Sequence, residues 1–150
     1  MQLLLVRHGQ TRSNVEMLLD TAHPGAPLDE TGHAQAAALA GRLAVDPVDG
    51  IYASDLTRTR QTAAPLAAAR GITPVVLPGL REIQAGDDEL SVDWTRYVAA
   101  LGAWRDDPSV RIPGGENGIE FMTRFDEAVG QVASAGHASA VLFTHGAALR

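Results

Sequence analysis

Short apolar runs alternate with alanine-rich stretches along this 150-residue chain, and this alternation constrains the fold more than any other feature. Each apolar run has the length of one strand, and the stretches between the runs include segments with the length and composition of a helix. This order is typical of an α/β domain with a mostly parallel sheet. The run Leu3–Val6 shows no polar alternation, as expected of a strand covered on both faces. We therefore expect residues 1–150 to form a single domain, a three-layer α/β/α sandwich.

The pattern assigns the expected elements to residue ranges. Asp29 or Thr31 is predicted to cap the first helix and Asp55 the second, and Pro65 is expected to kink or break the second. Loops are expected over residues 21–27 and 108–118. The predicted strands are Gln2–Val6, Gly50–Ala53, Thr73–Leu77 and Ser139–Phe143, and the predicted helices are Thr31–Leu43, Leu56–Ala69, Val92–Trp104 and Ile119–Ala135.

Composition excludes several classes of function. There is no cysteine, which rules out disulfides, thiolate catalysis and cysteine-ligated zinc. All 12 basic residues are arginine, so a phosphate-loop lysine and Schiff-base chemistry are also ruled out. A net charge of −6 disfavours binding to nucleic acid or to an anionic membrane. The apolar run near the start is too short for a signal peptide or a membrane span, so a cytoplasmic location is expected.

Residues with catalytic side chains follow the predicted strands. Ligands of parallel α/β sheets bind outside the carboxyl ends of the strands, so these residues are expected to converge at one edge. Two histidines, several arginines and one glutamate are among them. In chain order the segments are Arg7-His8-Gly9, Ser54-Asp55 with Arg58 one turn further on, Leu80-Arg81-Glu82 and Thr144-His145-Gly146.

These side chains suit phosphoryl transfer. Arg7 and Arg58 present paired planar donors that match phosphate oxygens and stay charged at any working pH. A neutral imidazole such as that of His8 can attack phosphorus and form a covalent intermediate. His145 could donate a hydrogen bond to the charge that develops on the phosphoryl oxygens, and Glu82 could protonate the leaving group. The arginines already neutralise the phosphoryl group, so we expect neither a metal nor a cofactor.

Five short motifs together resemble those of the histidine phosphatase superfamily, which contains phosphoglycerate mutase-like phosphatases and cofactor-dependent mutases. The resemblance runs from residue 2 to about residue 148 with every motif in family order. The motifs are Arg7-His8-Gly9-Gln10-Thr11 with Asn14, Ser54-Asp55-Leu56 with Arg58-Thr59 and Gln61-Thr62, Leu80-Arg81-Glu82, Gly114-Gly115-Glu116, and Thr144-His145-Gly146.

The resemblance implies a role for each matching residue. His8 corresponds to the phosphate-accepting nucleophile and Glu82 to the proton donor, which later activates water. Arg7, Arg58 and His145 correspond to the catalytic phosphate pocket. Asn14 would assist in that pocket, and Gly146 would begin a helix whose amides face the phosphate. Ser54 is assigned no part in catalysis.

The sequence departs from the family pattern in two places. The segment after Glu82 lacks the usual aromatic residue and Glu-Gly pair and carries the acidic run Asp87–Glu89, which predicts a more polar and acidic substrate side of the pocket. The chain also ends at Arg150, soon after His145. We therefore expect the domain to be incomplete at its carboxyl end and to lack the usual C-terminal helix and strand. An exposed sheet edge would then favour low stability or a homodimer.

The leading functional interpretation is a metal-independent phosphatase that hydrolyses a small phosphorylated metabolite through a phosphohistidine on His8. A phosphoglycerate mutase-type phosphotransferase is the first alternative. A mutase must shield its phosphohistidine from water, and the 32 positions from Glu82 to Gly114 leave little chain for a lid. A non-catalytic phospho-ligand binder is the second alternative. Such a binder would have no need of an acid beside a nucleophile.

Overall fold

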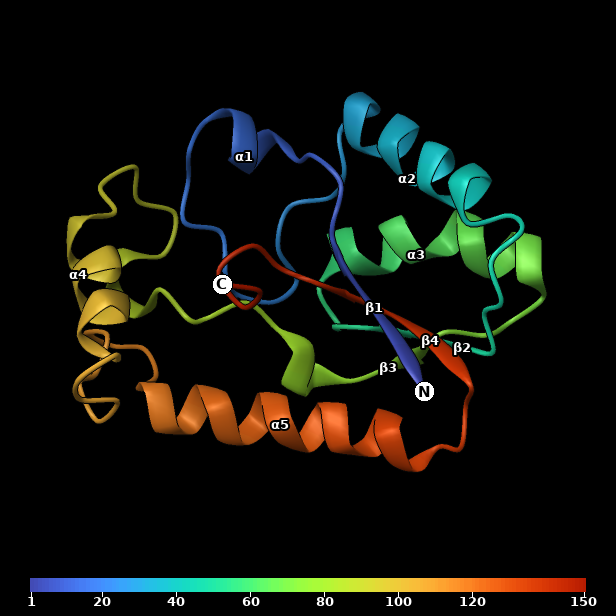
Figure 1. Cartoon of the computed structure of the whole chain (residues 1–150). Helices are drawn as coiled ribbons and strands as arrows, with labels where there is room; N and C mark the ends of the chain where they lie inside the picture. Colours follow the sequence, from blue (N-terminus) through green and yellow to red (C-terminus); the bar gives the residue numbers. More distant parts are fainter.

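A four-stranded parallel sheet lies at the centre of the computed structural model, which describes residues 1–150 (Figure 1). The strand order is β1-β4-β2-β3, with β1 at Gln2–Arg7, β2 at Gly50–Ala53, β3 at Val75–Val76 and β4 at Ser139–Thr144. Every residue of β4 is buried, in keeping with its position between β1 and β2. All four predicted strands are therefore confirmed, although the third is shorter than expected. β3 pairs only with β2 and is exposed at the sheet edge.

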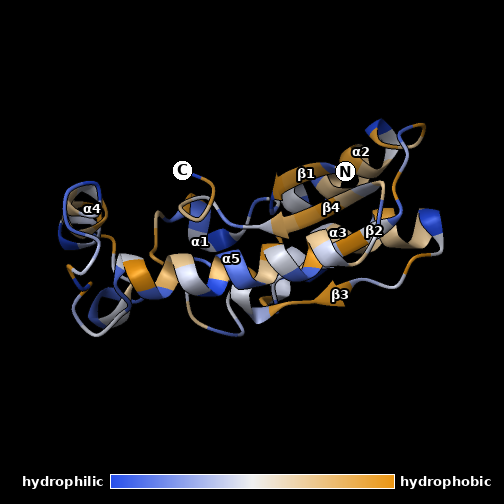
Figure 2. Ribbon diagram, turned by 60° about the horizontal axis from the view of Figure 1, so that its bottom comes forward, coloured by the Kyte–Doolittle hydropathy of each residue, from blue (hydrophilic) through white to orange (hydrophobic).

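Helices cover both faces of this sheet. The structure contains α1 at Arg12–Val15, α2 at Glu30–Arg42, α3 at Thr57–Arg70, α4 at Thr95–Ala103 and α5 at Gly118–Ser134, with short 3-10 turns η1 at Pro78–Leu80 and η2 at Gly86–Asp88. α2 and α3 pack on one face around Ile51 and Phe143, and α5 packs on the other against Tyr52 and Leu142. The predicted three-layer α/β/α sandwich is thus confirmed, and Figure 2 shows the apolar strands between these helices.

One prediction about α3 is wrong. Asp55 does not cap this helix, because its carboxylate binds the guanidinium of Arg81; the N-cap is Leu56, which offers no side-chain hydrogen bond. Of the kink or break expected at Pro65, the break does not occur, because the helix continues to Arg70. Proline removes one backbone hydrogen bond, but Leu66 beyond it is fully buried against the sheet, and this packing favours the continuous helix.

The other helices end close to the predicted residues. The Asp29 side chain accepts a hydrogen bond from the Gly32 amide and caps α2 as predicted. α4 starts three residues later than predicted, because the Asp93 carboxylate accepts from the Thr95 amide and so begins the helix there. Gly136 follows α5 with a φ of 79°, a left-handed conformation that suits glycine after a helix.

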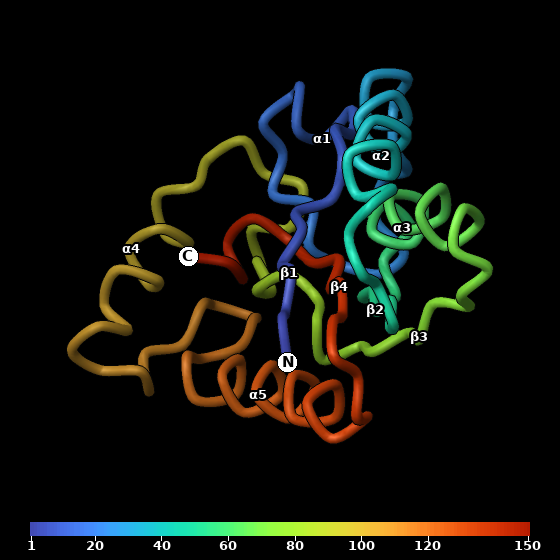
Figure 3. The backbone as a smooth tube through the Cα atoms, turned by 45° about the vertical axis from the view of Figure 1, so that its right-hand side comes forward, coloured from blue at the N-terminus to red at the C-terminus, as the bar shows by residue number.

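α4 and the loops around it lie beyond the carboxyl ends of β1 and β4 (Figure 2), and Figure 3 shows them to one side of the sheet. They pack around a third apolar cluster that includes Leu19, Ile83, Tyr97, Ile112 and Phe121. This cluster connects the loop after α1, the segment after η1, α4 and α5. It therefore supports the wall that faces the predicted active site. None of the helices has both the length and the apolar character needed to cross a membrane.

Candidate active site

The Arg7-His8-Gly9 segment continues directly from β1. The His8 amide donates to the Thr144 carbonyl at 3.1 Å, so the parallel ladder still holds the backbone at this point. At Gly9 the chain passes very close to the start of α2, and a Cβ on Gly9 would lie 2.7 Å from the Gly32 carbonyl oxygen. Only glycine fits such a contact, which explains why glycine follows the histidine.

The His8 ring presents an unprotonated nitrogen to Arg58. Nδ1 lies 2.7 Å from the Gly9 carbonyl oxygen, which can only accept, so Nδ1 carries the proton. Nε2 then accepts from Arg58 Nε at 3.1 Å. Burial of the ring, and secondarily the charge of Arg58, lowers the pKa of His8 to about 4. His8 is therefore neutral near neutral pH, with a nitrogen lone pair suited to attack on phosphorus.

Arg58 is held in place by the loop that follows α1. Its guanidinium is 3 % exposed and donates to the backbone carbonyl of Asp20 at 2.6 Å and to the Asp20 carboxylate at 3.4 Å. Burial lowers the pKa of Arg58, an effect that the charge of Asp20 opposes. Asp20 is thus a site residue that the sequence analysis missed. No sequence signal pointed to it, because it binds a residue 38 positions away.

His145 lies beside His8, with 5.2 Å between the ring centroids, and is completely buried. Its Nε2 forms a 2.8 Å hydrogen bond with the Ser54 hydroxyl, whereas its Nδ1 has no partner in the protein. Burial, followed by the charge of Arg58, holds the pKa of His145 well below its usual value. Ser54, to which the sequence analysis gave no role, therefore orients this ring.

The Glu82 carboxylate is 9 % exposed and accepts three backbone hydrogen bonds. Its donors are the amides of Ile83, Ala147 and Ala148, each at 2.9 Å. The family resemblance predicts that the amides following Gly146 face the phosphate. Two of them instead bind Glu82, and they join the segment after β4 to the segment after η1.

Six of the seven predicted site residues line one cavity of about 1,030 Å³. Gly146 approaches Arg7 closely, since a Cβ on Gly146 would lie 3.2 Å from Arg7 Nε. The Asn14 side-chain oxygen accepts from the Thr11 amide in a capping box at the start of α1. The lining residues among the seven are Arg7, His8, Asn14, Arg58, Glu82 and Gly146, and His145 lies beside His8 without lining the cavity.

The substrate side of the cavity does not have the acidic character expected from the run Asp87–Glu89. The Glu89 carboxylate accepts from the amide and hydroxyl of Thr21, and the Asp88 carboxylate pairs with Arg96. Neither carboxylate lines the cavity. The wall is apolar and aromatic instead, and α4 with the loop before it contributes Trp94, Tyr97, Val98 and Leu101.

The buried histidines predict a pH dependence of stability. The pKa of His8 is about 4 in the fold and 6.5 ordinarily, so between these values the unfolded chain binds more protons. Stability should therefore be greatest above pH 6.5 and fall as the pH drops towards 4, by about 3 kcal/mol from His8 at about 1.4 kcal/mol per pKa unit. The lowered pKa of His145 likewise makes the stability fall as the pH drops.

Urea unfolding at a series of pH values measures this dependence. In His8→Asn, which cannot titrate, the loss of unfolding free energy on acidification should be smaller than in the parent protein. In His33→Asn, a matched change at an exposed histidine on α2, the loss should be unaltered. Equal losses in the parent protein and His8→Asn would contradict the prediction.

Comparison with known proteins agrees with this geometry. The family model of the histidine phosphatase superfamily (branch 1) matches residues 3–150. The PE-PGRS family protein PE_PGRS11 of Mycobacterium tuberculosis is 44% identical over 151 residues, which cover 94% of this chain and 26% of that protein. The adenosylcobalamin/alpha-ribazole phosphatase of Salmonella typhimurium is 36% identical over 127 residues, which cover 83% of this chain and 62% of the phosphatase. This chain therefore spans less than two thirds of either relative.

Solved structures extend the similarity to the fold. A mycobacterial glucosyl-3-phosphoglycerate phosphatase, determined in complex with VO3, is 30% identical with a TM-score of 0.82, and the match covers 98% of this chain and 77% of that one. Other curated relatives are named as probable phosphoglycerate mutases. Both phosphatases and mutase-like proteins are thus among the relatives.

Proposed function

The chain belongs to the histidine phosphatase superfamily, and from that premise we propose that it hydrolyses a small phosphomonoester through a phosphohistidine on His8. The observation that carries the proposal is the state of the His8 ring. A buried neutral imidazole directs the lone pair of Nε2 at a buried arginine, inside a cavity that also holds a carboxyl group. Nucleophile, phosphate-binding cation and proton donor are the three groups that such a reaction needs.

In the first step the phosphoryl group binds between Arg7 and Arg58, and Arg58 exchanges its hydrogen bond to His8 for one to a phosphoryl oxygen. His8 Nε2 attacks phosphorus, and the P–N bond forms as the bond to the ester oxygen breaks. Protonated Glu82 gives its proton to that oxygen, so the alcohol leaves neutral. The arginines and a proton on His145 Nδ1 stabilise the charge on the equatorial oxygens.

In the second step the phosphohistidine is hydrolysed. Glu82, now a carboxylate, takes a proton from a water molecule that attacks phosphorus, and the P–N bond breaks. Inorganic phosphate leaves, His8 Nε2 regains its lone pair, and Glu82 is protonated for the next cycle. Atoms and charges balance with these residues alone.

Rapid-quench labelling with a ³²P-labelled phosphate ester tests the proposal. The protein should become labelled within one turnover, and the label should survive alkali and be lost in acid, as expected of a phosphohistidine. A chelator should leave the labelling unchanged. Hydrolysis without any label would contradict a covalent route. A label that persists until a second acceptor is added would indicate a phosphotransferase instead.

A further inference from the structure

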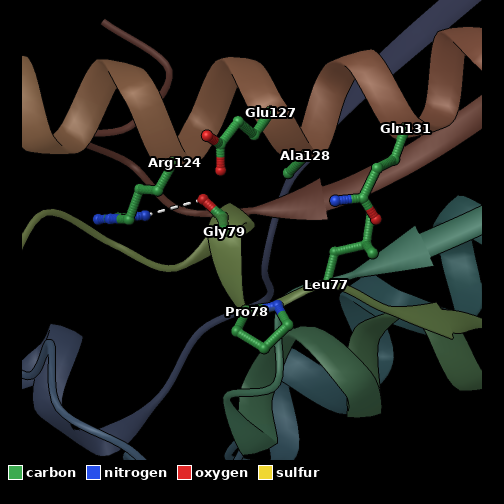
Figure 4. Close-up of a pocket in the computed structure, with 7 residues that line it drawn as sticks. All are labelled: Leu77, Pro78, Gly79, Arg124, Glu127, Ala128 and Gln131. Carbon is green, nitrogen blue, oxygen red and sulfur yellow. Dashed lines mark hydrogen bonds between the residues drawn. The ribbon is translucent and has the colours of Figure 1, made fainter.

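Arg124 on α5 reaches across to the backbone segment that carries Glu82, and all five of its N–H donors are used. Nε and one terminal nitrogen bind the Glu116 carboxylate at 2.8 and 2.5 Å. The remaining hydrogen bonds go to the carbonyls of Gly79, Arg81 and Glu82 at 2.8, 3.0 and 2.9 Å. Figure 4 shows Arg124 extending from α5 towards Gly79.

Glu116 extends this arrangement to the other side of Glu82. Its side chain is 6 % exposed, and besides Arg124 its Oε1 accepts from the Gln84 amide at 3.0 Å. The ion pair therefore holds the backbone both before and after Glu82. The Arg124 side chain is itself 22 % exposed, so the pair lies at the edge of the core.

This part of the chain depends on side chains for its shape. Residues 81–85 belong to no helix or strand, so no ladder of backbone hydrogen bonds fixes them. Buried carbonyl and amide groups nevertheless need partners, and Arg124 and Glu116 supply them. At Gly79 the two elements almost touch, since a Cβ there would lie 2.4 Å from the Arg124 carbonyl oxygen.

We propose that Arg124, together with Glu116, is a positioning residue for Glu82. Neither side chain lines the active-site cavity, so both act through the backbone that carries the proton donor. This inference rests on the proposed function, because it takes Glu82 as the acid. A carboxyl group that shifts by a fraction of an ångström still fills its site but protonates the leaving oxygen less effectively.

Substrates with different leaving groups distinguish a positioning role of Arg124 from a purely structural one. p-Nitrophenolate leaves without much help from an acid, whereas an alkoxide needs a proton. Loss of positioning should therefore lower kcat/KM for an alkyl phosphate much more than for p-nitrophenyl phosphate. Loss of folded protein would lower both values equally.

Arg124→Lys is the test variant, because lysine keeps the charge beside Glu116 but cannot form all five hydrogen bonds. We expect kcat/KM for glycerol 2-phosphate to fall at least about tenfold further than for p-nitrophenyl phosphate. Arg70→Lys is the matched control. Arg70 likewise donates to backbone carbonyls, those of Leu43 and Asp46, but lies at the far end of α3. In Arg70→Lys the ratio of kcat/KM for glycerol 2-phosphate to kcat/KM for p-nitrophenyl phosphate should equal that of the parent protein.

Two further variants distinguish failure of this inference from failure of the proposed function. Glu82→Gln should show the leaving-group effect by itself, and Arg124→Lys should add no further effect in that background. An effect in Glu82→Gln with equal losses in Arg124→Lys would overturn the positioning role alone. No effect in Glu82→Gln would overturn the acid on which both depend. If Arg124→Lys does not fold, the ratio of kcat/KM for the same two substrates is measured for Glu116→Gln instead. Glutamine keeps the shape of the glutamate and one acceptor oxygen.

Discussion

His8→Ala is expected to abolish turnover, lowering kcat by more than about 10⁴-fold, as removal of a catalytic nucleophile does elsewhere. The physical reason is that in the proposed route the P–N bond forms at His8 Nε2, the atom that accepts from Arg58 Nε at 3.1 Å. The phosphate-binding groups remain, so the variant should still bind inorganic phosphate with an affinity within about tenfold of the parent. Turnover of p-nitrophenyl phosphate and calorimetric titration with inorganic phosphate measure the two quantities separately.

The control for this variant is His33→Ala, at an exposed position on α2 away from the cavity. It should retain full turnover. His8→Ala leaves a space beside Arg58, so its unfolding midpoint in urea is needed to show that the fold persists. Folded His8→Ala protein with more than a tenth of the parental kcat would contradict a histidine nucleophile.

The sequence could predict that the site residues lie close together, because their proximity follows from the topology of the sheet. In a parallel sheet every strand ends at the same edge, so residues directly after β1 and β4 must be neighbours, as His8 and His145 are. Local patterns also fixed the strand positions to within a residue or two, since a buried strand needs an uninterrupted apolar run. β3 is the strand most shortened relative to its prediction, because Pro74 offers no amide and only two residues pair.

Contacts between loops could not be predicted in this way. Asp20 binds Arg58 and Asp55 binds Arg81, and in each pair the partners come from segments whose sequences show no common signal. Asp55 has the residue type and position of a helix cap, but a guanidinium fork in reach is a stronger partner than a backbone amide. The prediction of an acidic substrate side from the run after Glu82 is wrong for the same reason, because Glu89 binds the backbone at Thr21 rather than solvent or substrate.

Glu82→Gln is expected to lower kcat/KM for an alkyl phosphate by about 10²–10⁴-fold, the usual contribution of general acid catalysis. kcat/KM covers the steps up to release of the alcohol, so it reports on the acid alone. For p-nitrophenyl phosphate the same quantity should change much less. Glutamine keeps the size of the side chain but replaces one acceptor of the Ala147 and Ala148 amides with a donor. Glu82→Asp, which keeps the carboxyl group and shortens its reach, is therefore the companion variant.

The proposed second step gives Glu82→Gln a signature that a general loss of activity cannot produce. With p-nitrophenyl phosphate, phosphorylation of His8 stays fast while the water that should attack phosphorus has lost its base. The phosphoenzyme should then accumulate, so that a burst of p-nitrophenol approaches one equivalent and the steady rate that follows is slow. With an alkyl phosphate, phosphorylation itself limits the rate and no burst should occur. A burst with neither substrate, together with equal losses in kcat/KM for both, would mean that a group other than Glu82 moves the proton.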